Sequence, residues 1–312
     1  MFKRRKILIT TLLLITALIF TACTQSNSDG ESKNIEEKDS KYPLTIVDSY
    51  DREVRIDKEP IKVISVAPNI TETIFALGQG EKLVGRTDYC EYPEDAKQIE
   101  SIGSLESPNI EKILSLNPDL VIASTHFKKD VLQKLEELGL KVMVLYGEES
   151  FQGVYQVIEK LGTVLNAKEE ADKVIANMKQ KVTNVITTVK DAEKPEVYYV
   201  VGFGESGDYT AGRGTFIGEM IKMAGGKNAA DDVKGWKYSL ERLVEKDPDI
   251  LICSKGYSPK EKVILANGYK DLTAVKNGKI FDIDNDLLEI QGPRLADGLE
   301  RLAKIIHPEL FR

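Results

Sequence analysis

Aromatic side chains that could hold a large, flat ligand occur in three separate parts of the sequence. Tyr89 and Tyr92 follow a predicted strand and turn. Tyr209 lies in a glycine-rich loop, and Trp236 is the only tryptophan of the chain. Tyrosine and tryptophan combine a rigid apolar face with a polar end, which suits a large and partly apolar ligand. Ordinary packing in the core or in a loop is the alternative for each of the four.

A cation stands at the predicted start of the last helix. Arg294 follows Gly292-Pro293, where the helix dipole disfavours positive charge, so the side chain needs a partner. That partner is either an amide, phosphate or carboxylate of a ligand, or a structural ion pair with Asp297 or Asp286.

The chain has two histidines. His126 comes shortly after the predicted strand Leu120–Ala123, and ligands of α/β folds gather at the carboxyl ends of strands. It could coordinate haem iron or cobalt, or lie exposed in a loop. His307 precedes Pro308 at the end of the last predicted helix, where capping accounts for it. Because zinc and manganese sites usually use several histidines, we expect no metal-ion site.

One glycine-rich segment matches a dinucleotide-binding pattern. Residues Gly202–Gly207 read G-x-G-x-x-G after a predicted strand, and Asp231 follows downstream. In a dinucleotide fold the helix begins within the glycine motif, whereas here Asp208–Gly214 intervenes. We therefore expect no nicotinamide binding. No nucleophile triad is convincing either, so we expect no enzyme activity.

Two glutamates occupy equivalent places in two copies of one pattern. Residues 110–125 read IEKILSLNPDLVIAST, and residues 240–255 read LERLVEKDPDILICSK. At an offset of 130, Glu111 coincides with Glu241, and a Pro-Asp pair coincides as well. Both copies predict a helix, a turn and a buried strand. The repeat therefore predicts two related halves that arose by duplication.

The predicted helix starts place both glutamates in a first helical turn. Ser107-Pro108 is the expected N-cap and first residue of one helix, and Ser239 is the expected N-cap of the other. An acid in a first turn is stabilised by the helix dipole, which would account for Glu111 and Glu241 without any partner.

Composition places these features in a folded, water-soluble body. The 312 residues are 42% hydrophobic and 30% charged, which allows a sizeable core over two units. Three cysteines exclude a disulfide scaffold, and we expect no disulfide between Cys90 and Cys253. The net charge of −7 argues against a nucleic-acid partner, because phosphate contacts require a basic surface.

The N-terminus has the pattern of an export signal. Basic residues Lys3–Lys6 precede the apolar run 7–20, which is short for a membrane span. Cys23 then stands where a bacterial lipobox has its lipidated cysteine, although Phe20 replaces the usual leucine. We expect removal of the signal peptide 1–22 and a lipid on Cys23. An ordinary signal or an uncleaved anchor is the alternative.

The residues after the signal are expected to form a tether. Residues 23–41 are almost entirely polar and cannot bury an apolar face, so they predict a lipid-anchored flexible segment. Cleavage would remove four cations and take the net charge from −7 to −11. The folded part would then sit outside the cytoplasm, anchored to the cell membrane.

From Tyr42 onward, short apolar runs alternate with amphipathic stretches, which predicts an α/β fold with mostly parallel sheets. The predicted strands are Lys62–Val66, Leu120–Ala123, Val142–Leu145, Val197–Val201, Ile250–Cys253 and Ile280–Asp282. The predicted helices are Ile70–Leu77, Ile110–Leu116, Val131–Leu138, Phe151–Leu165, Glu169–Val189, Phe216–Ala224, Leu240–Glu245 and Pro293–Ile306. We expect an N-terminal lobe at 42–166, one long connecting helix at 167–193 and a C-terminal lobe at 194–312, with a ligand cleft between the lobes.

Taken together, six stretches resemble the substrate-binding lipoproteins of bacterial ABC importers for cobalamin, siderophores and haem, which form class III of the periplasmic-binding-protein-like proteins. The stretches are Val63–Gly78, Val84–Pro93, Ile110–Ile122, Tyr209–Gly214, Leu240–Ile252 and Gly292–Pro308. The resemblance covers residues 43–312 and implies two α/β lobes joined by a single long helix. Asp88–Pro93 looks most like the cobalamin binders of this class.

The resemblance also implies roles for individual residues. A glutamate on each lobe of such proteins meets arginines of the membrane permease, so Glu111 and Glu241 are predicted docking acids. The predicted ligand-binding residues are Tyr89, Tyr92, Tyr209, Trp236, Arg294, Pro68 and Asn69. Two departures stand against this set: Leu105 and Ser124 occupy positions where cobalamin binders can carry tryptophan, and Trp236 is shifted by one residue.

We therefore predict a monomeric lipoprotein that captures cobalamin or a related corrinoid and passes it to an ABC permease with its ATPase. It would need no cofactor of its own. A ferric siderophore or haem is the alternative in the same class. Siderophores would require cationic residues around the cleft, and haem would require an axial ligand such as His126. An exported α/β enzyme is the alternative from another class.

Overall fold

The computed structural model describes residues 41–204 and 207–311. These residues belong to a single structural unit. The predicted signal peptide, Cys23 and all of the tether except Lys41 lie outside the described residues, so these features stay predictions.

The N-terminal lobe is built on a four-stranded parallel sheet with the order β4-β3-β5-β6. Its elements are the hairpin β1 (Leu44–Val47) and β2 (Glu53–Ile56), β3 (Val63–Ser65), α2 (Pro68–Ala76), β4 (Leu83–Arg86), α3 (Ile110–Leu116), β5 (Leu120–Ala123), α4 (Lys129–Glu137), β6 (Val142–Val144) and α5 (Phe151–Val164). Strand β5 is buried along its whole length. Its unbroken apolar run is what a strand covered on both faces requires.

The C-terminal lobe repeats this architecture with the strand order β9-β7-β11-β12. Its elements are β7 (Glu196–Val200), β8 (Asp208–Tyr209), α7 (Phe216–Met223), β9 (Lys227–Asn228), β10 (Lys237–Tyr238), α8 (Leu240–Lys246), β11 (Ile250–Ser254), α9 (Lys260–Val263), α10 (Thr273–Lys276), β12 (Ile280–Ile283), α11 (Asp286–Glu289) and α12 (Leu295–Ile306). The two sheets correspond strand by strand, which supports the predicted duplication.

The repeated Pro-Asp pair has the same structural role in both lobes. Helices α3 and α8 each end on a residue with left-handed backbone, and the Pro-Asp pair follows directly. The Asp119 carboxylate accepts the backbone N–H of Lys62 at 3.0 Å, and that of Asp249 accepts the N–H of Glu196 at 2.8 Å. Both donors lie where the neighbouring strand, β3 or β7, begins. The pair therefore follows the end of a helix and aligns the strand after it, β5 or β11, with that neighbour.

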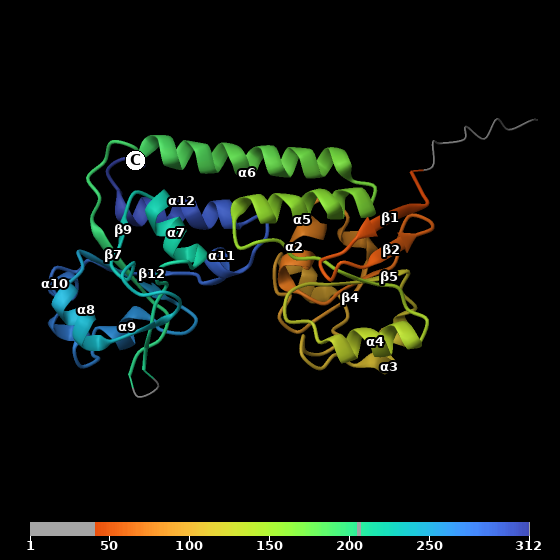
Figure 1. The fold of residues 1–312 in the computed structure, drawn as a ribbon, viewed down its shortest axis with the longest axis horizontal. Coiled ribbons are helices and arrows are strands. Elements are labelled where there is room, and N and C mark those ends of the chain that lie inside the picture. Colours follow the sequence, from red (N-terminus) through yellow and green to blue (C-terminus); the bar gives the residue numbers. More distant parts are fainter. Residues whose placement is uncertain (1–40, 205–206, 312) are drawn as a thin grey trace, which may run out of the picture. The chain divides into compact units, whose positions relative to one another are not determined.

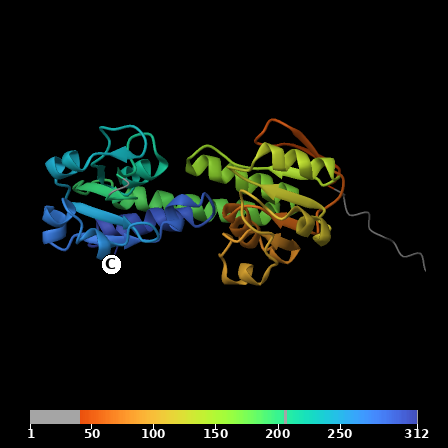
Figure 2. The ribbon, with the colours of Figure 1, turned by 90° about the horizontal axis from the view of Figure 1, so that it is seen from below.

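Helix α6 (Lys168–Thr188) connects the lobes and runs along both of them (Figure 1). Its buried residues Ala171, Met178 and Val185 are spaced seven apart and form one narrow apolar stripe. The helix packs against α5 of the first lobe and α12 of the second. One apolar core continues through this contact from lobe to lobe, and the turned view also shows the lobes at the two ends of α6 (Figure 2).

The predicted α/β fold with two lobes is confirmed, and the predicted strands and helices are present with ends shifted by at most two residues. One helix start was wrong. Asn109, not Ser107, caps α3, since its side chain accepts the N–H of Lys112 at 3.0 Å. The Ser239 cap of α8 is confirmed.

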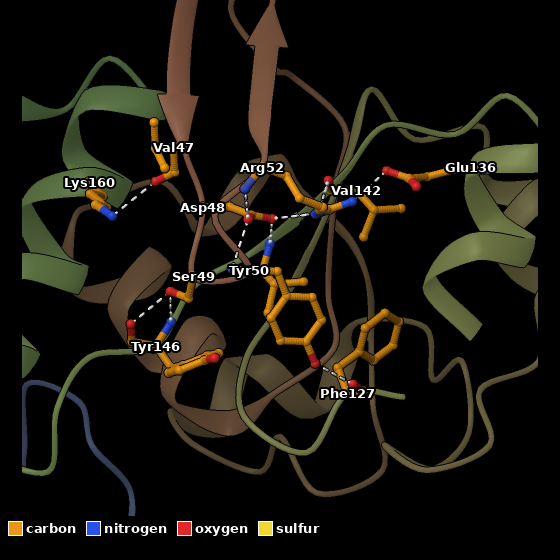
Figure 3. Close-up of polar contacts among 11 residues, drawn as sticks. Val47, Asp48, Ser49, Tyr50, Arg52, Phe127, Glu136, Val142, Tyr146 and Lys160 are labelled. Atoms are coloured by element: carbon orange, nitrogen blue, oxygen red, sulfur yellow. Dashed lines mark hydrogen bonds and ion pairs between the residues drawn. The ribbon is translucent and has the colours of Figure 1, made fainter. Parts of the chain in front are cut away.

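The turn of the β1–β2 hairpin is anchored to the N-terminal sheet by a buried carboxylate (Figure 3). Asp48 accepts the backbone N–H groups of Tyr50 at 2.9 Å, Arg52 at 3.1 Å and Val144 at 3.2 Å. The guanidinium of Arg52 binds the same carboxylate and extends to Glu136 on α4 at 2.6 Å. The hairpin is thereby fixed to β6 and α4.

The same turn holds two loops at the carboxyl end of the sheet (Figure 3). The Tyr50 hydroxyl donates to the carbonyl of Phe127 at 2.7 Å, just after β5. The Ser49 hydroxyl donates to the carbonyl of Tyr146 at 2.8 Å and accepts the N–H of Tyr146 at 2.9 Å, just after β6. These loops border the cavity described below.

Acid should weaken this anchor. Burial opposes ionisation, but the hydrogen bonds from Arg52 and three backbone N–H groups bring the pKa of Asp48 below its usual value. The unfolded chain therefore binds a proton more readily, with a pKa of about 3.9. The stabilisation from Asp48 is complete above that pH and is lost as the pH falls through the folded-state pKa.

We predict that Asp48→Asn lowers the free energy of unfolding by about 1–3 kcal/mol at neutral pH. Its deficit relative to wild type should shrink as the pH is lowered from about 6 to about 3, as measured by urea unfolding. Asp51→Asn on the exposed tip of the same turn serves as the control and should change little. A deficit that stays constant with pH would contradict the role given to Asp48.

Candidate ligand-binding site

A cavity of about 250 Å³ lies at the carboxyl ends of β3 and β5. In the order β4-β3-β5-β6, strand β3 has β4 on one side and β5 on the other. The chain connection after β3 leads to β4, and the connection after β4 crosses back to β5 on the opposite side of β3. Open α/β sheets bind ligands at such a switch point. The C-terminal lobe adds residues 289–291 to the wall, so the cavity lies between the two lobes.

Two of the predicted ligand-binding residues line the cavity at this switch point. Pro68 and Asn69 begin α2 and line the cavity. The Asn69 side-chain amide donates to the Ser124 hydroxyl at 3.1 Å, which links the ends of β3 and β5. Ser124 and Leu105 also line the cavity. The two positions named above as departures from the resemblance are thus wall positions.

His126 lines the cavity from the loop after β5. It is exposed and has left-handed backbone with φ of 64°. The neighbouring Phe127 is buried and held by Tyr50, so the hairpin fixes the loop that carries His126. His307 is the C-cap residue of α12, as predicted, and its backbone N–H donates to the carbonyl of Ala303 at 2.8 Å. Its buried ring contacts the carbonyl of Gly225, after α7, at 3.2 Å.

The charged side chains of the cavity wall are mostly acidic. Glu149 and Glu289 line it, and its described lining contains neither lysine nor arginine. Burial, with the nearby charges of Asp286 and Asp284, raises the pKa of Glu289 above its usual value, while hydrogen bonds from Tyr257 and Asn285 oppose the rise. The described wall therefore offers no lysine or arginine to a ligand that carries negative charge.

Arg294 forms an ion pair between the lobes. Its Nε and Nη2 atoms lie 2.9 and 2.6 Å from the two carboxylate oxygens of Glu72 on α2, and both side chains are largely buried. Its guanidinium also stacks 3.8 Å from the ring centroid of Tyr92. The expected structural partners were therefore wrong: Asp297 pairs with Lys181 of α6 instead, and Asp286 acts on Arg294 only through its charge.

The four predicted aromatic contacts are all exposed, which excludes core packing for them. Tyr209 and Trp236 share the two-stranded ribbon of β8 and β10, where the N–H of Thr210 donates to the carbonyl of Trp236 at 2.7 Å. Tyr92 stacks with Arg294, and Tyr89 lies three residues before it. None of the four lines the cavity, so their contact with a ligand stays a prediction.

The glycine-rich segment leads into this two-stranded ribbon and is hydrogen-bonded to it. Strand β8 follows it at once, and the next helix begins only at Phe216. Gly202 exchanges backbone hydrogen bonds with Tyr209, at 3.2 and 2.9 Å, and a Cβ atom at Gly202 would meet the Tyr209 ring at 3.3 Å. The described part of the motif therefore lacks the helix start of a dinucleotide site. Cys90 and Cys253 are both buried and free.

Glu111 and Glu241 are the second residues of α3 and α8, and both are exposed. Hydrogen bonds from its own backbone N–H and from Ser239 lower the pKa of Glu241. Across the described residues, no cluster of three or more histidine, cysteine, aspartate or glutamate side chains could hold a metal ion.

Several wall residues were not predicted. Tyr146 and Glu149 follow β6, and the rule that drew attention to His126 at a strand end would have found them. Glu289 and Gln291 precede the resembling stretch Gly292–Pro308 and carry no comparable signal.

Two α/β lobes joined by one helix, with a cavity at strand ends between them, define the class of two-lobed substrate-binding proteins. Residues 63–287 match the model of the periplasmic binding protein family, and the chain belongs to this family.

Individual proteins agree with this assignment. An uncharacterized ABC transporter substrate-binding lipoprotein of Bacillus subtilis is 34% identical over 307 residues, 96% of each chain. A cobalamin-binding protein of Halobacterium salinarum is 26% identical over 95% of this chain and 84% of its own length. The crystal structure of a possible iron-binding protein from Staphylococcus epidermidis has a TM-score of 0.71 at 31% identity, covering 80% of this chain and 100% of that one.

The family consists of substrate-binding transport proteins rather than enzymes. Such proteins act outside the cytoplasm together with the permease and ATPase of an ABC importer. None of the helices within 41–204 and 207–311 combines the length and apolarity needed to cross a bilayer.

Proposed function

We propose that the chain captures cobalamin or a related corrinoid and delivers it to an ABC permease. The observation that carries this choice is the charge of the cavity wall, where Glu149 and Glu289 stand without a lysine or arginine among the described lining residues. Ferric citrate is anionic, and haem carries two carboxylates. A corrinoid has neutral amide side chains around a cationic cobalt centre, and the anionic group of cobalamin is its nucleotide phosphate. The amide-bearing edge therefore meets this wall without charge repulsion.

The size of the cavity indicates how such a ligand would bind. Pockets that enclose a small molecule usually measure about 300–1,000 Å³, and this one measures about 250 Å³. A corrinoid would therefore place only one edge in the cavity. The rest of its surface would need flat, exposed partners outside it, which Tyr89, Tyr92, Tyr209 and Trp236 can supply. The cobalamin-binding relative supports this choice.

Haem is the second candidate, because His126 in the cavity wall offers an axial ligand. Its propionates would face the acidic wall, which ranks haem below a corrinoid. As part of the same proposal, Cys23 carries the lipid, residues 23–41 form the tether, and the protein acts as a monomer with lobes at 42–166 and 194–312.

Titration of the purified full chain with cyanocobalamin, haemin and ferric citrate tests the ligand. Trp236 is the only tryptophan, so a ligand beside it should change the fluorescence. We expect saturable one-to-one binding of cyanocobalamin by calorimetry, a matching fluorescence change, and much weaker binding of the other two.

Trp236→Phe is the control, since it should remove the fluorescence signal but keep measurable heat of binding. Saturable binding of haemin or ferric citrate, with no heat on adding cyanocobalamin, would overturn the choice of ligand.

A further inference from the structure

Glu289 is a carboxylate of the cavity wall that its neighbours hold in place. It is the last residue of α11, and it is partly buried. The Tyr257 hydroxyl donates to its Oε2 atom at 3.2 Å, and the Asn285 side chain forms a second hydrogen bond to the carboxylate. Glu149, which also lines the cavity, is exposed. Of these two acids, Glu289 is therefore the preformed hydrogen-bond acceptor, whereas solvent screens Glu149.

The turn that carries Tyr257 is itself fixed. It joins β11 to α9, and the N–H of Gly256 donates to the Asn285 Oδ1 atom at 3.0 Å. The Ser258 hydroxyl donates to the carbonyl of Val201, just after β7, at 2.9 Å. A Cβ atom at Gly256 would meet Asn285 Oδ1 at 2.4 Å, so glycine permits this close approach. Tyr257 therefore stands at the carboxyl ends of β7 and β11, the switch point of the second sheet.

The polar groups near Glu289 in the cavity are neutral. Gln291 follows Glu289 by two residues and lines the same wall, and Asn69 and Ser124 line the cavity from the other lobe. Side-chain amides and hydroxyls both donate and accept hydrogen bonds, whereas a carboxylate only accepts them. A primary amide of a ligand satisfies this set, because it brings N–H donors and a carbonyl acceptor. A ligand carboxylate in the same place would bring no proton to Glu289 and would repel its charge.

We propose that Glu289, positioned by Tyr257, selects corrinoids that carry peripheral amides over the corresponding carboxylic acids. The Glu289 carboxylate accepts an N–H of an amide at the edge of the corrin ring, and it repels a carboxylate at that position. Tyr257 acts through Glu289, whose orientation its hydroxyl fixes. This inference rests on the proposed capture of a corrinoid and names the group of the ligand that the cavity recognises.

Two corrinoids that lack the nucleotide isolate the effect. Dicyanocobinamide carries amides where dicyanocobyrinic acid carries carboxylates, and neither has the nucleotide phosphate. Calorimetry of the purified full chain with each compound gives the ratio of the two affinities. We expect wild type to bind dicyanocobinamide about a hundredfold more tightly. Glu289→Gln should reduce this ratio about tenfold, because glutamine has no charge and can donate an N–H to a carboxylate.

Two further variants separate selection from structural support. Tyr257→Phe removes only the hydroxyl of a side chain that is 62% exposed, and it should reduce the ratio about threefold. Glu261→Gln changes an exposed acid on α9 of the same lobe and should keep the wild-type ratio. A purely structural role of Glu289 would weaken the binding of both corrinoids equally and leave the ratio unchanged.

The outcomes distinguish this inference from the proposed function. Equal binding of the two corrinoids by wild type, or the wild-type ratio in Glu289→Gln, would overturn the selection by Glu289. If Glu289→Gln does not fold, a ratio for Tyr257→Phe equal to that for Glu261→Gln would overturn it as well. Failure of wild type to bind either cyanocobalamin or dicyanocobinamide would contradict the proposed function instead.

Discussion

Glu72→Ala should lower the free energy of unfolding by about 3–5 kcal/mol, the penalty of leaving a buried charge without its partner. The Glu72 side chain is 3% exposed and that of Arg294 is 17% exposed, so little water reaches the guanidinium to take the place of the lost carboxylate. Burial raises the pKa of Glu72, and the hydrogen bond and charge of Arg294 oppose that rise. Urea unfolding of the full chain measures the effect.

Asp297→Ala is the matched control, because it removes another ion pair that joins the C-terminal lobe to a neighbouring element. Asp297 and Lys181 are 42% and 36% exposed, and such a surface pair contributes about 0–1 kcal/mol. If Glu72→Ala does not fold, Glu72→Met/Arg294→Met should restore folding, since it removes both charges. A cost for Glu72→Ala no larger than that for Asp297→Ala would show that the pair does not hold the lobes.

The double variant Glu111→Ala/Glu241→Ala should lose uptake of labelled cyanocobalamin to the level of cells without the protein. Each carboxylate lacks an ion pair among the described residues and lies on an exposed helix face. Each single variant removes one charged contact and should slow uptake about tenfold. Ligand affinity should not change, because neither residue lines the cavity.

Glu137→Ala/Glu261→Ala is the control for total charge. These acids are also exposed, and they too lie one on each lobe, on α4 and α9. The control should retain uptake. Wild-type uptake by Glu111→Ala/Glu241→Ala, with the same amount of protein at the cell surface, would contradict docking through these acids.

The predictable parts of the fold are those with strong local patterns. Strands β5 and β11 are buried apolar runs after a Pro-Asp turn, and the repeat itself identified them. The β1–β2 hairpin was missed because burial alternates along both of its strands, so neither has the fully buried apolar run that marks β5 and β11. The turn that joins them is held by Asp48, through contacts with β6 and α4. The start of α3 was misjudged because Ser107 and Asn109 are both good caps, and only the structure shows which side chain meets an N–H group.

The residues of the candidate site also fall into those that the sequence predicted and those that it did not. Pro68 and Asn69 follow from the resembling stretch, and His126 follows from its place at a strand end. The Glu72–Arg294 pair joins residues 222 positions apart, and its formation depends on how both lobes pack along α6. No local sequence pattern predicts this contact between the lobes. The acidic wall likewise combines Glu149 of one lobe with Glu289 of the other.

Uptake of labelled cyanocobalamin by the native cells, at a limiting concentration, tests capture and delivery together. Cells from which this protein has been deleted should take up far less than wild-type cells, and the full chain supplied from a plasmid should restore uptake. Equal uptake with and without the protein would contradict the account. Uptake restored by Glu111→Ala/Glu241→Ala would contradict its docking step alone.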